Sequence, residues 1–298
     1  MLAFTWSGFA QQIISGLSTG GIYASLALAL VIIYRSTRVI NFAQGEMATF
    51  STFIAWELIN QGLSKWVAFL ATLLISFAGG VLLERTVIRP VERAPVLTIV
   101  MVTIGLLILI NGATFWKWGG ATRIFPSAFS TRAIHVGSVA FSIQDLGFIG
   151  VSLAAVGLLY LLFQFTKVGL AMRATAVNPN ASRLAGIRVG WMLSLGWGIA
   201  AALGALAGMM TAPTAQLDPN MMRGVLLYAF AAAVLGGLES PIGAVVGGLS
   251  LGVILNILGT YTSFFAGDMR LVGGFAIILA VLVFRPSGLF GRTVARKV

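Results

Sequence analysis

Long apolar runs constrain the fold of this chain more than any other feature. The hydrocarbon core of a bilayer is about 30 Å thick, so a helix needs roughly 20 mostly apolar residues to cross it. Nine segments approach that requirement: 8–33, 39–60, 66–83, 96–116, 145–165, 191–213, 225–239, 242–260 and 268–284. They lack the alternation of apolar and polar residues that marks membrane strands. The runs therefore predict an all-α polytopic helical membrane protein with about 8–10 transmembrane segments, including broken helices.

Composition excludes most other classes of protein. Charged residues make up 9% of the 298 residues, whereas an ordinary soluble domain carries roughly a quarter. So few charges cannot cover a water-soluble globule, and the high apolar content excludes disorder. The chain has no cysteine and a single histidine, so we expect no disulfide, no metal site and no cofactor in it. No basic residue precedes the first apolar run, so we interpret that run as a mature span rather than a signal peptide.

The net charge of +11 indicates membrane orientation rather than nucleic-acid binding. Lys and Arg accumulate in cytoplasmic loops of membrane proteins. If the N-terminus lies outside and all nine segments cross, 13 of the 19 basic residues fall inside and the C-terminus is cytoplasmic. The inside set comprises Arg35, Arg38, Arg85, Arg89, Arg93, Lys167, Arg173, Arg183, Arg188, Arg285, Arg292, Arg296 and Lys297.

The same reading predicts one transmembrane domain over 1–298, with an external loop at 117–144 and an internal loop at 166–190. Two of its segments, 39–60 and 225–239, are poor spans because they carry polar residues or are short. Both are kept as crossings because dropping 225–239 alone would place the basic C-terminus outside. A break within either segment would need protein or a water-filled cavity around it.

Segment 39–60 carries the first polar constellation: Asn41, Gln44 and Glu46, with Gly45 between the last two. A carboxylate inside a membrane costs a few kcal/mol unless it is paired or hydrated. One interpretation is a broken helix beside a polar cavity on a transport pathway. The other is that Glu46 lies near the inner interface and pairs with Arg38 or another basic residue.

The internal loop carries the second constellation. Asn178 is a good N-cap, and Pro179 suits the first position of a helix. Gly186 is a plausible C-terminal stop. We therefore expect a short helix at 179–185 after a helical lead-in; it is either a rigid handle for a partner or part of an ordinary surface loop.

The third constellation is Glu239 and Ser240, beside glycines and a proline between two apolar runs. It predicts a tight turn or a break, in which Glu239 caps the following helix. Glycine pairs at four-residue spacing also recur, and small residues at that spacing let membrane helices approach closely. The pairs are Gly16 and Gly20, Gly204 and Gly208, Gly243 and Gly247, and Gly248 and Gly252.

Catalytic interpretations are weak. The stretches 16–20 and 248–252 both match G-x-S-x-G, but that motif needs a strand–turn–helix context and a histidine partner. The one histidine, His135, falls in the external loop. The chain has no Gly-Lys dipeptide and hence no P-loop, so any ATP hydrolysis must occur on another subunit.

Four stretches carry a resemblance to a known family. They are Gly20–Ala24, then RVINFAQGE at 38–46, GLAMRATAVNPNASRLAGI at 169–187 and AAVLGGLESPIGAVVGG at 232–248. Their order and spacing, and the length of the chain, resemble the Liv H-type permease subunits of ATP-binding-cassette importers for branched-chain amino acids. The resemblance covers almost the whole chain. One departure is Gln44, where family members often carry histidine.

The resemblance implies partners and a location. Such a permease pairs with a second, M-type permease in a bacterial inner membrane, where lipid surrounds the spans. Two cytoplasmic ATPases use ATP and Mg²⁺ beneath the pair, and a periplasmic binding protein delivers the substrate. By match, the internal loop is the coupling segment that docks on an ATPase, through Arg173, Asn178, Pro179, Ala181, Arg183, Leu184 and Gly186.

The expected function is therefore a permease subunit, not an enzyme, that forms the pathway for leucine, isoleucine and valine. Related permeases for urea, short amides or other amino acids are the alternative, and a stand-alone secondary transporter is a weaker one. An apolar pathway that releases its cargo should hold few charges, so Glu46 is a candidate for structure or gating. The pathway or gating candidates are Asn41, Gln44, Glu46, Glu239 and Ser240.

Overall fold

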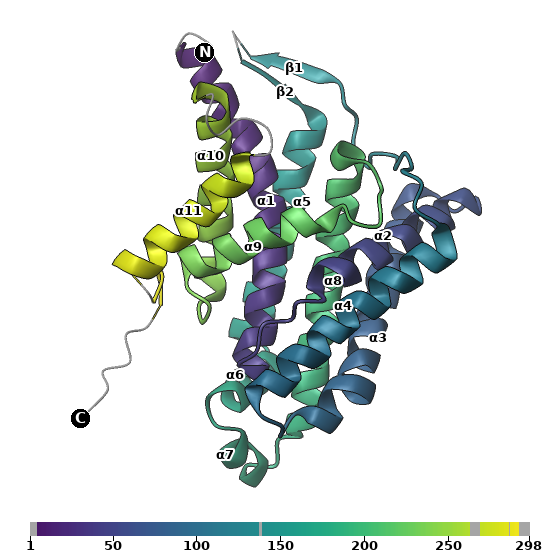
Figure 1. The fold of residues 1–298 in the computed structure, drawn as a ribbon, viewed down its shortest axis with the longest axis vertical. Helices are drawn as coiled ribbons and strands as arrows, with labels where there is room; N and C mark the ends of the chain where they lie inside the picture. Colours follow the sequence, from purple (N-terminus) through teal and green to yellow (C-terminus); the bar gives the residue numbers. More distant parts are fainter. Residues whose placement is uncertain (1–4, 137–138, 263–268, 286, 292–298) are drawn as a thin grey trace. The chain divides into compact units, whose positions relative to one another are not determined.

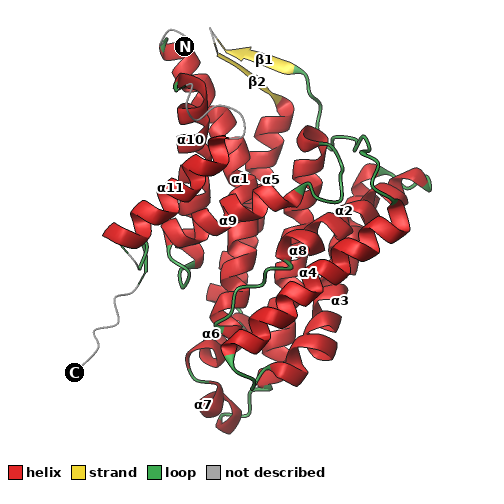
Figure 2. Ribbon diagram, in the orientation of Figure 1, coloured by secondary structure: helices red, strands yellow, loops and turns green. Residues whose placement is uncertain are grey.

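A computed structural model describes residues 5–136, 139–262, 269–285 and 287–291, and helices dominate it (Figures 1 and 2). The α-helices are α1 (Trp6–Thr37), α2 (Gln44–Asn60), α3 (Lys65–Leu83), α4 (Val96–Trp118), α5 (Ile143–Phe165), α6 (Lys167–Val177), α7 (Pro179–Leu184), α8 (Val189–Ala215), α9 (Met222–Gly236), α10 (Pro241–Tyr261) and α11 (Met269–Phe284). A π-helix, η1 (Glu84–Ile88), and a 3₁₀ turn, η2 (Arg89–Val91), extend α3. Strands β1 (Ala133–Val136) and β2 (Val139–Ser142) form an antiparallel hairpin.

The helices confirm a polytopic helical membrane protein. In the part of the chain that the structure describes, α1, α3 with its extension, α4, α5, α8 and α10 are long and apolar enough to cross a membrane. Helices α9 and α11 are apolar but have only 15 and 16 residues. Helix α2 has 17 residues and carries two glutamates. The count of nine crossings therefore stays a prediction.

The chain divides into two compact units. Unit 1 contains Met1–Val31, Phe129–Ser152 and Gly224–Val298, and unit 2 contains Ile32–Ala128 and Leu153–Arg223. Each unit is assembled from segments that lie far apart in the sequence. Helices α1 and α5 each begin in unit 1 and end in unit 2.

In unit 1, glycines bring α1 and α10 into backbone contact. A Cβ added to Gly20 would lie 2.9 Å from the carbonyl oxygen of Gly248, and one added to Gly252 would lie 2.4 Å from the Cα of Gly20. A side chain larger than hydrogen does not fit between these helices, as small-residue packing in membranes requires. The two G-x-S-x-G matches are thus opposite sides of one helix contact, without the strand–turn–helix context of a hydrolase.

Helices α9 and α10 pack in the same way across the turn that joins them. A Cβ on Gly243 would lie 2.2 Å from the carbonyl oxygen of Gly236, and one on Gly247 would lie 2.2 Å from that of Ala232. The C-terminal segment folds back onto this turn, where Leu289 N donates to Leu235 O at 2.8 Å. Gly204 and Gly208 of α8 likewise face α2, so all four glycine pairs singled out in the sequence lie at close helix contacts.

Unit 2 is built around α8, which packs against both α2 and α3. A Cβ on Gly208 would lie 2.3 Å from Thr52 Oγ1 of α2, and one on Gly80 of α3 would lie 2.5 Å from the carbonyl oxygen of Trp197. Trp197 is among the largest fully buried side chains. Small residues therefore set how closely these three helices approach.

An aromatic cluster joins the C-terminal end of α4 to α2 in the same unit. The Trp118 ring stacks on Phe53 with centroids 5.1 Å apart, and Trp118 Nε1 donates to Glu57 Oε2 at 3.1 Å. Residue Glu57 also pairs with Lys117 at 3.0 Å. The carboxylate is thus held at the end of α2, as a residue near a membrane interface would be.

Candidate functional site

Segment 39–60 is not broken in its middle: α2 runs as one helix from Gln44 to Asn60, and the non-helical stretch is the linker that precedes it. Helix α1 ends at Thr37 and α2 begins only at Gln44, with Arg38 at φ 58°, the left-handed region. Between them, Asn41 Oδ1 accepts a hydrogen bond from Ala43 N at 3.0 Å. Asn41 Nδ2 donates to Gln44 Oε1 at 3.1 Å. The polar side chains thus replace hydrogen bonds that a continuous helix would have made.

Residue Gln44 anchors this irregular segment to α8. Its Nε2 donates to the backbone carbonyl of Ala200 at 2.8 Å, and the Gln44 side chain is fully buried. A Cβ on Gly204 would lie 2.6 Å from the same Nε2. The glycine therefore leaves the room that the amide occupies, and Asn41 and Gln44 together hold the start of α2 in place.

Glu46 lies two residues further on, in the first turn of α2, and is 4% exposed. Its Oε2 accepts a hydrogen bond from Asn111 Nδ2 of α4 at 3.0 Å. The same amide nitrogen lies 3.3 Å from the carbonyl oxygen of Pro219 and from Asn220 Oδ1. The amide of Asn111 on α4 therefore links the Glu46 carboxylate on α2 to the segment before α9.

The basic partner of Glu46 is Arg223, at the start of α9. Arg223 Nε lies 3.7 Å from Glu46 Oε1, and the two side chains are 60% and 5% exposed. That distance is too long for a hydrogen bond, and one partner is open to solvent, so the pair is weak and separable. Glu46 therefore pairs with a basic residue, as one of its two interpretations expected, but the residue is Arg223 rather than Arg38, and its position near the inner interface stays a prediction.

The second constellation folds as its capping residues predict. Asn178 Oδ1 accepts from Ala181 N at 3.0 Å, Pro179 occupies the first turn of α7, and Gly186 has φ +80°. The helical lead-in is α6, which Thr166 caps by accepting from Gly169 N at 3.0 Å. The helix expected at 179–185 ends one residue earlier, at Leu184.

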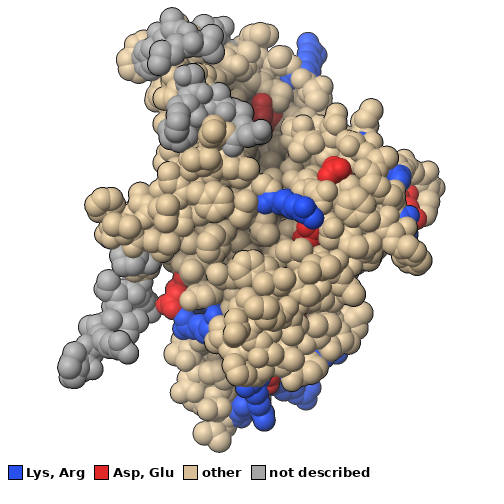
Figure 3. Space-filling view, viewed as in Figure 1, with Lys and Arg blue, Asp and Glu red and all other residues tan. Residues whose placement is uncertain are grey.

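The short helix presents apolar and basic side chains outward. Leu184 is 91% exposed, and Val177 at the end of α6 is 83% exposed. Arg183 donates to Asn180 Oδ1 at 3.5 Å, and Arg173 donates to Gln164 Oε1 at 3.2 Å. On the face in Figure 3, blue side chains gather at the lower end, where Figure 1 places α6, α7 and the lower ends of α3, α4 and α8.

A buried ionic network at the same end of unit 2 was not foreseen from the sequence. Glu84 is 1% exposed; it accepts from Arg89 Nη2 at 2.8 Å and from Ser194 Oγ at 2.5 Å. Arg89 Nη2 also donates to Gly190 O at 2.7 Å. The network joins η1 and η2 to the first two turns of α8. A search at the i, i+4 spacing of α-helices misses a pair five residues apart.

The third constellation forms a turn in unit 1, with one correction. Ser240, not Glu239, caps α10: Ser240 Oγ accepts from Gly243 N at 3.0 Å. A serine three residues before the N–H that it accepts has the N-cap geometry, and Glu239 stands one position too early. Gly237 has φ +104°, which closes the turn.

Comparisons with known proteins identify the family. The family described as "Branched-chain amino acid transport system / permease component" matches residues 12–283. The chain belongs to this permease family.

Relatives of the permease agree with that assignment and differ in cargo. The high-affinity branched-chain amino acid transport system permease protein LivH of Salmonella typhimurium is 30% identical over 97% of this chain and 98% of its own. The corresponding protein BraD of Pseudomonas aeruginosa is 30% identical over 97% and 98%. The xylose/arabinose import permease protein XylH of Sulfolobus acidocaldarius is 28% identical over 82% and 69%.

The family confirms the expected class of protein. The permease is a multi-pass membrane transport subunit, as the resemblance implied. Within the described residues, no group of three or more His, Cys, Asp or Glu side chains could hold a metal ion.

Proposed function

We propose that this permease forms, together with a second, M-type permease, the pathway by which leucine, isoleucine and valine enter a bacterial cell across its inner membrane. Two relatives that are 30% identical over nearly the full chain carry branched-chain amino acid transport in their names. The apolar helices of both units suit a pathway that releases an aliphatic cargo. A periplasmic binding protein supplies the affinity and delivers the substrate.

The structure of α7 is the observation that supports docking of this permease on ATPase subunits. It is capped at its start by Asn178, begins with Pro179, and exposes Leu184 to 91%. An apolar side chain this exposed, beside basic residues and outside the spans, fits a docking contact with another protein. Two ATPase subunits bind here and hydrolyse ATP with Mg²⁺, since this chain has no P-loop.

The proposed orientation places α7 in the cytoplasm. With the N-terminus outside and the C-terminus inside, most Lys and Arg lie on the cytoplasmic side, where they accumulate in membrane proteins. Loop 166–190 then faces the ATPases, and loop 117–144 faces the binding protein.

Glu46 and Arg223 form the candidate gate. Their 3.7 Å separation and the exposure of Arg223 make the pair easy to open, while Asn111 keeps Glu46 hydrogen-bonded in either state. ATP can operate this gate only if ATP binding to the complex changes the free-energy difference between the closed and the open state of the gate. Asn41 and Gln44 hold the start of α2 next to it; Glu239 and Ser240 shape a turn of unit 1 and are weaker candidates.

A pull-down tests the partnership. The tagged chain is extracted gently from its native membrane, and the proteins that co-purify are identified by mass. We expect a P-loop ATPase and a second permease of similar size. A clean homo-oligomer without an ATPase would instead favour a stand-alone secondary transporter.

Uptake competition tests the cargo. In membrane vesicles supplied with the binding protein, unlabelled isoleucine and valine should displace labelled leucine, whereas urea, acetamide and xylose should not. Xylose is included because a 28% identical relative is named for xylose and arabinose import. Displacement by urea or acetamide but not by isoleucine would replace the branched-chain assignment with the alternative cargo.

A further inference from the structure

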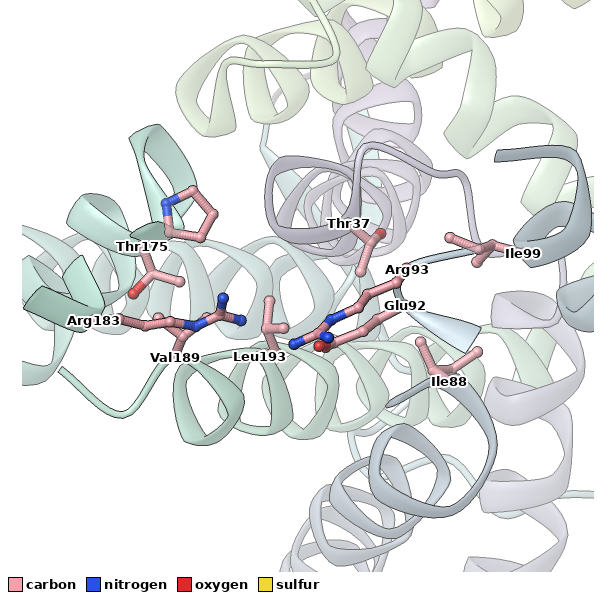
Figure 4. A pocket seen from close by; sticks show the side chains of 10 residues that line it. Thr37, Ile88, Glu92, Arg93, Ile99, Thr175, Arg183, Val189 and Leu193 are labelled. Atoms are coloured by element: carbon pink, nitrogen blue, oxygen red, sulfur yellow. The ribbon is translucent and has the colours of Figure 1, made fainter. Parts of the chain in front are cut away.

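A pocket of about 230 Å³ lies beside α7, entirely within unit 2 (Figure 4). Its walls come from the end of α1, the π-helix, the start of α4, α6, α7 and the first turns of α8. The volume is below the roughly 300–1,000 Å³ of pockets for drug-sized ligands. The lining residues are Thr37, Ile88, Glu92, Arg93, Ile99, Thr175, Pro179, Arg183, Val189 and Leu193.

Charges of both signs line this pocket. Arg183 of α7 and Arg93, just before α4, extend toward one another, with Leu193 between them (Figure 4). Among the described residues, no carboxylate forms an ion pair with Arg93 or Arg183, and no basic side chain pairs with Glu92. Two guanidinium groups that share a small pocket repel each other, and an anionic group between them removes that repulsion.

A buried hydroxyl in the same lining lacks a partner. Thr175 is 4% exposed, and its Oγ1 has no hydrogen bond to any described residue. Buried polar atoms are nearly always hydrogen-bonded, so an unpaired one beside a cavity indicates a ligand or water that completes it. This observation is independent of the charges and adds one buried polar atom without a hydrogen bond to the residues that line the pocket.

The remaining wall is aliphatic. Ile88, Ile99 and Val189 are buried, and Leu193 and Pro179 complete the lining. A small ligand for this pocket therefore combines a carboxylate for the arginines, a cation for Glu92 and a compact apolar group for the aliphatic wall. A free phosphate or a lipid headgroup would match the arginines but neither Glu92 nor the aliphatic wall.

We propose that this pocket binds the branched-chain amino acid itself, on the side where it is released, and that binding slows the transporter. The inference rests on the proposed function for its substrate class and for the cytoplasmic position of α7. The α-carboxylate lies between Arg93 and Arg183, the ammonium faces Glu92, and the side chain packs against Ile88 and Leu193.

Bound amino acid would slow ATP turnover because it would connect α7 to the turn before α4. Arg183 belongs to α7, which docks on the ATPase, while Arg93 and Glu92 belong to the turn before α4. A ligand that bridges them stabilises one position of α7 relative to the rest of unit 2. Because a ligand shifts a conformational equilibrium toward the state that it binds better, accumulated product would hold α7 and reduce ATP turnover.

The test uses the complete importer in proteoliposomes, with leucine on the α7 side. We expect internal L-leucine to lower the ATP hydrolysis rate several-fold. L-leucinamide, which lacks the carboxylate, and 4-methylpentanoate, which lacks the amine, should each need about tenfold higher concentration, since each loses one charge-assisted contact. Inorganic phosphate should have no effect; inhibition by phosphate but not by leucine would replace the proposal with a phosphate or lipid-headgroup site.

Variants separate this pocket from other leucine sites in the complex. Arg93→Gln and Glu92→Gln should abolish inhibition by internal leucine and leave hydrolysis without leucine near the wild-type rate. The matched control is Arg85→Gln, an exposed arginine of the same stretch that stacks on Trp191 at 4.0 Å and does not line the pocket. Thermal melting of each purified variant shows whether it folds. The two pocket variants test the proposal separately, because one removes a positive charge and the other a negative charge.

The outcomes distinguish this inference from the proposed function. If leucine uptake proceeds and internal leucine leaves hydrolysis unchanged, the pocket proposal is wrong and the transport proposal stands. If uptake of all three amino acids is absent in an intact complex, the proposed function fails. Inhibition that persists in both pocket variants would place the feedback site elsewhere and also overturn the proposal.

Discussion

Gln44 Nε2 donates a 2.8 Å hydrogen bond to the backbone carbonyl of Ala200, 156 positions further along the chain. Both groups are buried, and Gly204 one turn later leaves the space for the amide. This bond connects the break before α2 to α8. Because it fixes where α2 begins, it also sets where the carboxylate of Glu46 lies.

Replacing Gln44 with leucine should destabilise the chain. The carbonyl oxygen of Ala200 loses its side-chain donor, and the amide of Asn41 loses its acceptor. Buried polar groups left unpaired in this way lower the free energy of unfolding by about 1–3 kcal/mol. Thermal melting in detergent should show a lower Tm. Gln61→Leu, at the exposed end of α2, is the matched control, and an equal Tm for both variants would contradict the anchoring role.

Gly252→Ala should be much more harmful than Gly105→Ala. A Cβ at 252 would lie 2.4 Å from the Cα of Gly20, whereas nothing lies within 4 Å of one at 105. Forcing the α1–α10 contact apart costs about 1–3 kcal/mol, while alanine at an open helical position gains up to about 1 kcal/mol. Folded yield and Tm report the difference, and similar losses from both variants would refute the packing role.

Glu46→Gln should impair transport but not assembly. The amide can still bond to Asn111, but the ion pair with Arg223 is lost, so we expect leucine uptake to fall about tenfold, the effect of roughly 1.4 kcal/mol. Glu57→Gln, in the same helix, should transport normally. Normal uptake and normal assembly of the Glu46 variant would exclude a gating role.

Leu184→Asp should disconnect the ATPase. The side chain is 91% exposed, so the substitution should leave the fold unchanged while placing a charge at the docking contact. Co-purified ATPase should fall at least severalfold, with the M-type permease still bound. Arg132→Glu, an exposed charge change in the other loop, is the control. Unchanged ATPase recovery for Leu184→Asp would show that α7 is not the docking segment.

Features governed by local rules could be predicted from the sequence. The apolar runs predicted where the long helices lie within a few residues. Asn178, Pro179 and Gly186 predicted both ends of α7, because capping depends on neighbouring residues. The glycine pairs likewise indicated helix contacts, although not which helix each pair would face.

Features that depend on residues far apart could not be predicted. Nothing near Glu46 in the sequence points to Asn111 or Arg223, which reach it only through packing in unit 2. The Glu84–Arg89 pair needs the π-helix spacing. The hairpin of β1 and β2 did have a local signal, two short apolar runs at 133–136 and 139–142 separated by Gly137 and Ser138, which the prediction of a plain external loop did not use. The pocket of Arg93 and Arg183 joins residues 90 positions apart and has no sequence signature.

The most direct test of this account is ATP-dependent uptake by the purified complex in proteoliposomes. Labelled leucine and the binding protein are supplied on one side, and ATP with Mg²⁺ on the side of α7. We expect leucine to accumulate only when both ATP and the binding protein are present, and not in the Leu184→Asp complex. Leucine accumulation that proceeds without ATP, or without any ATPase subunit, would contradict it.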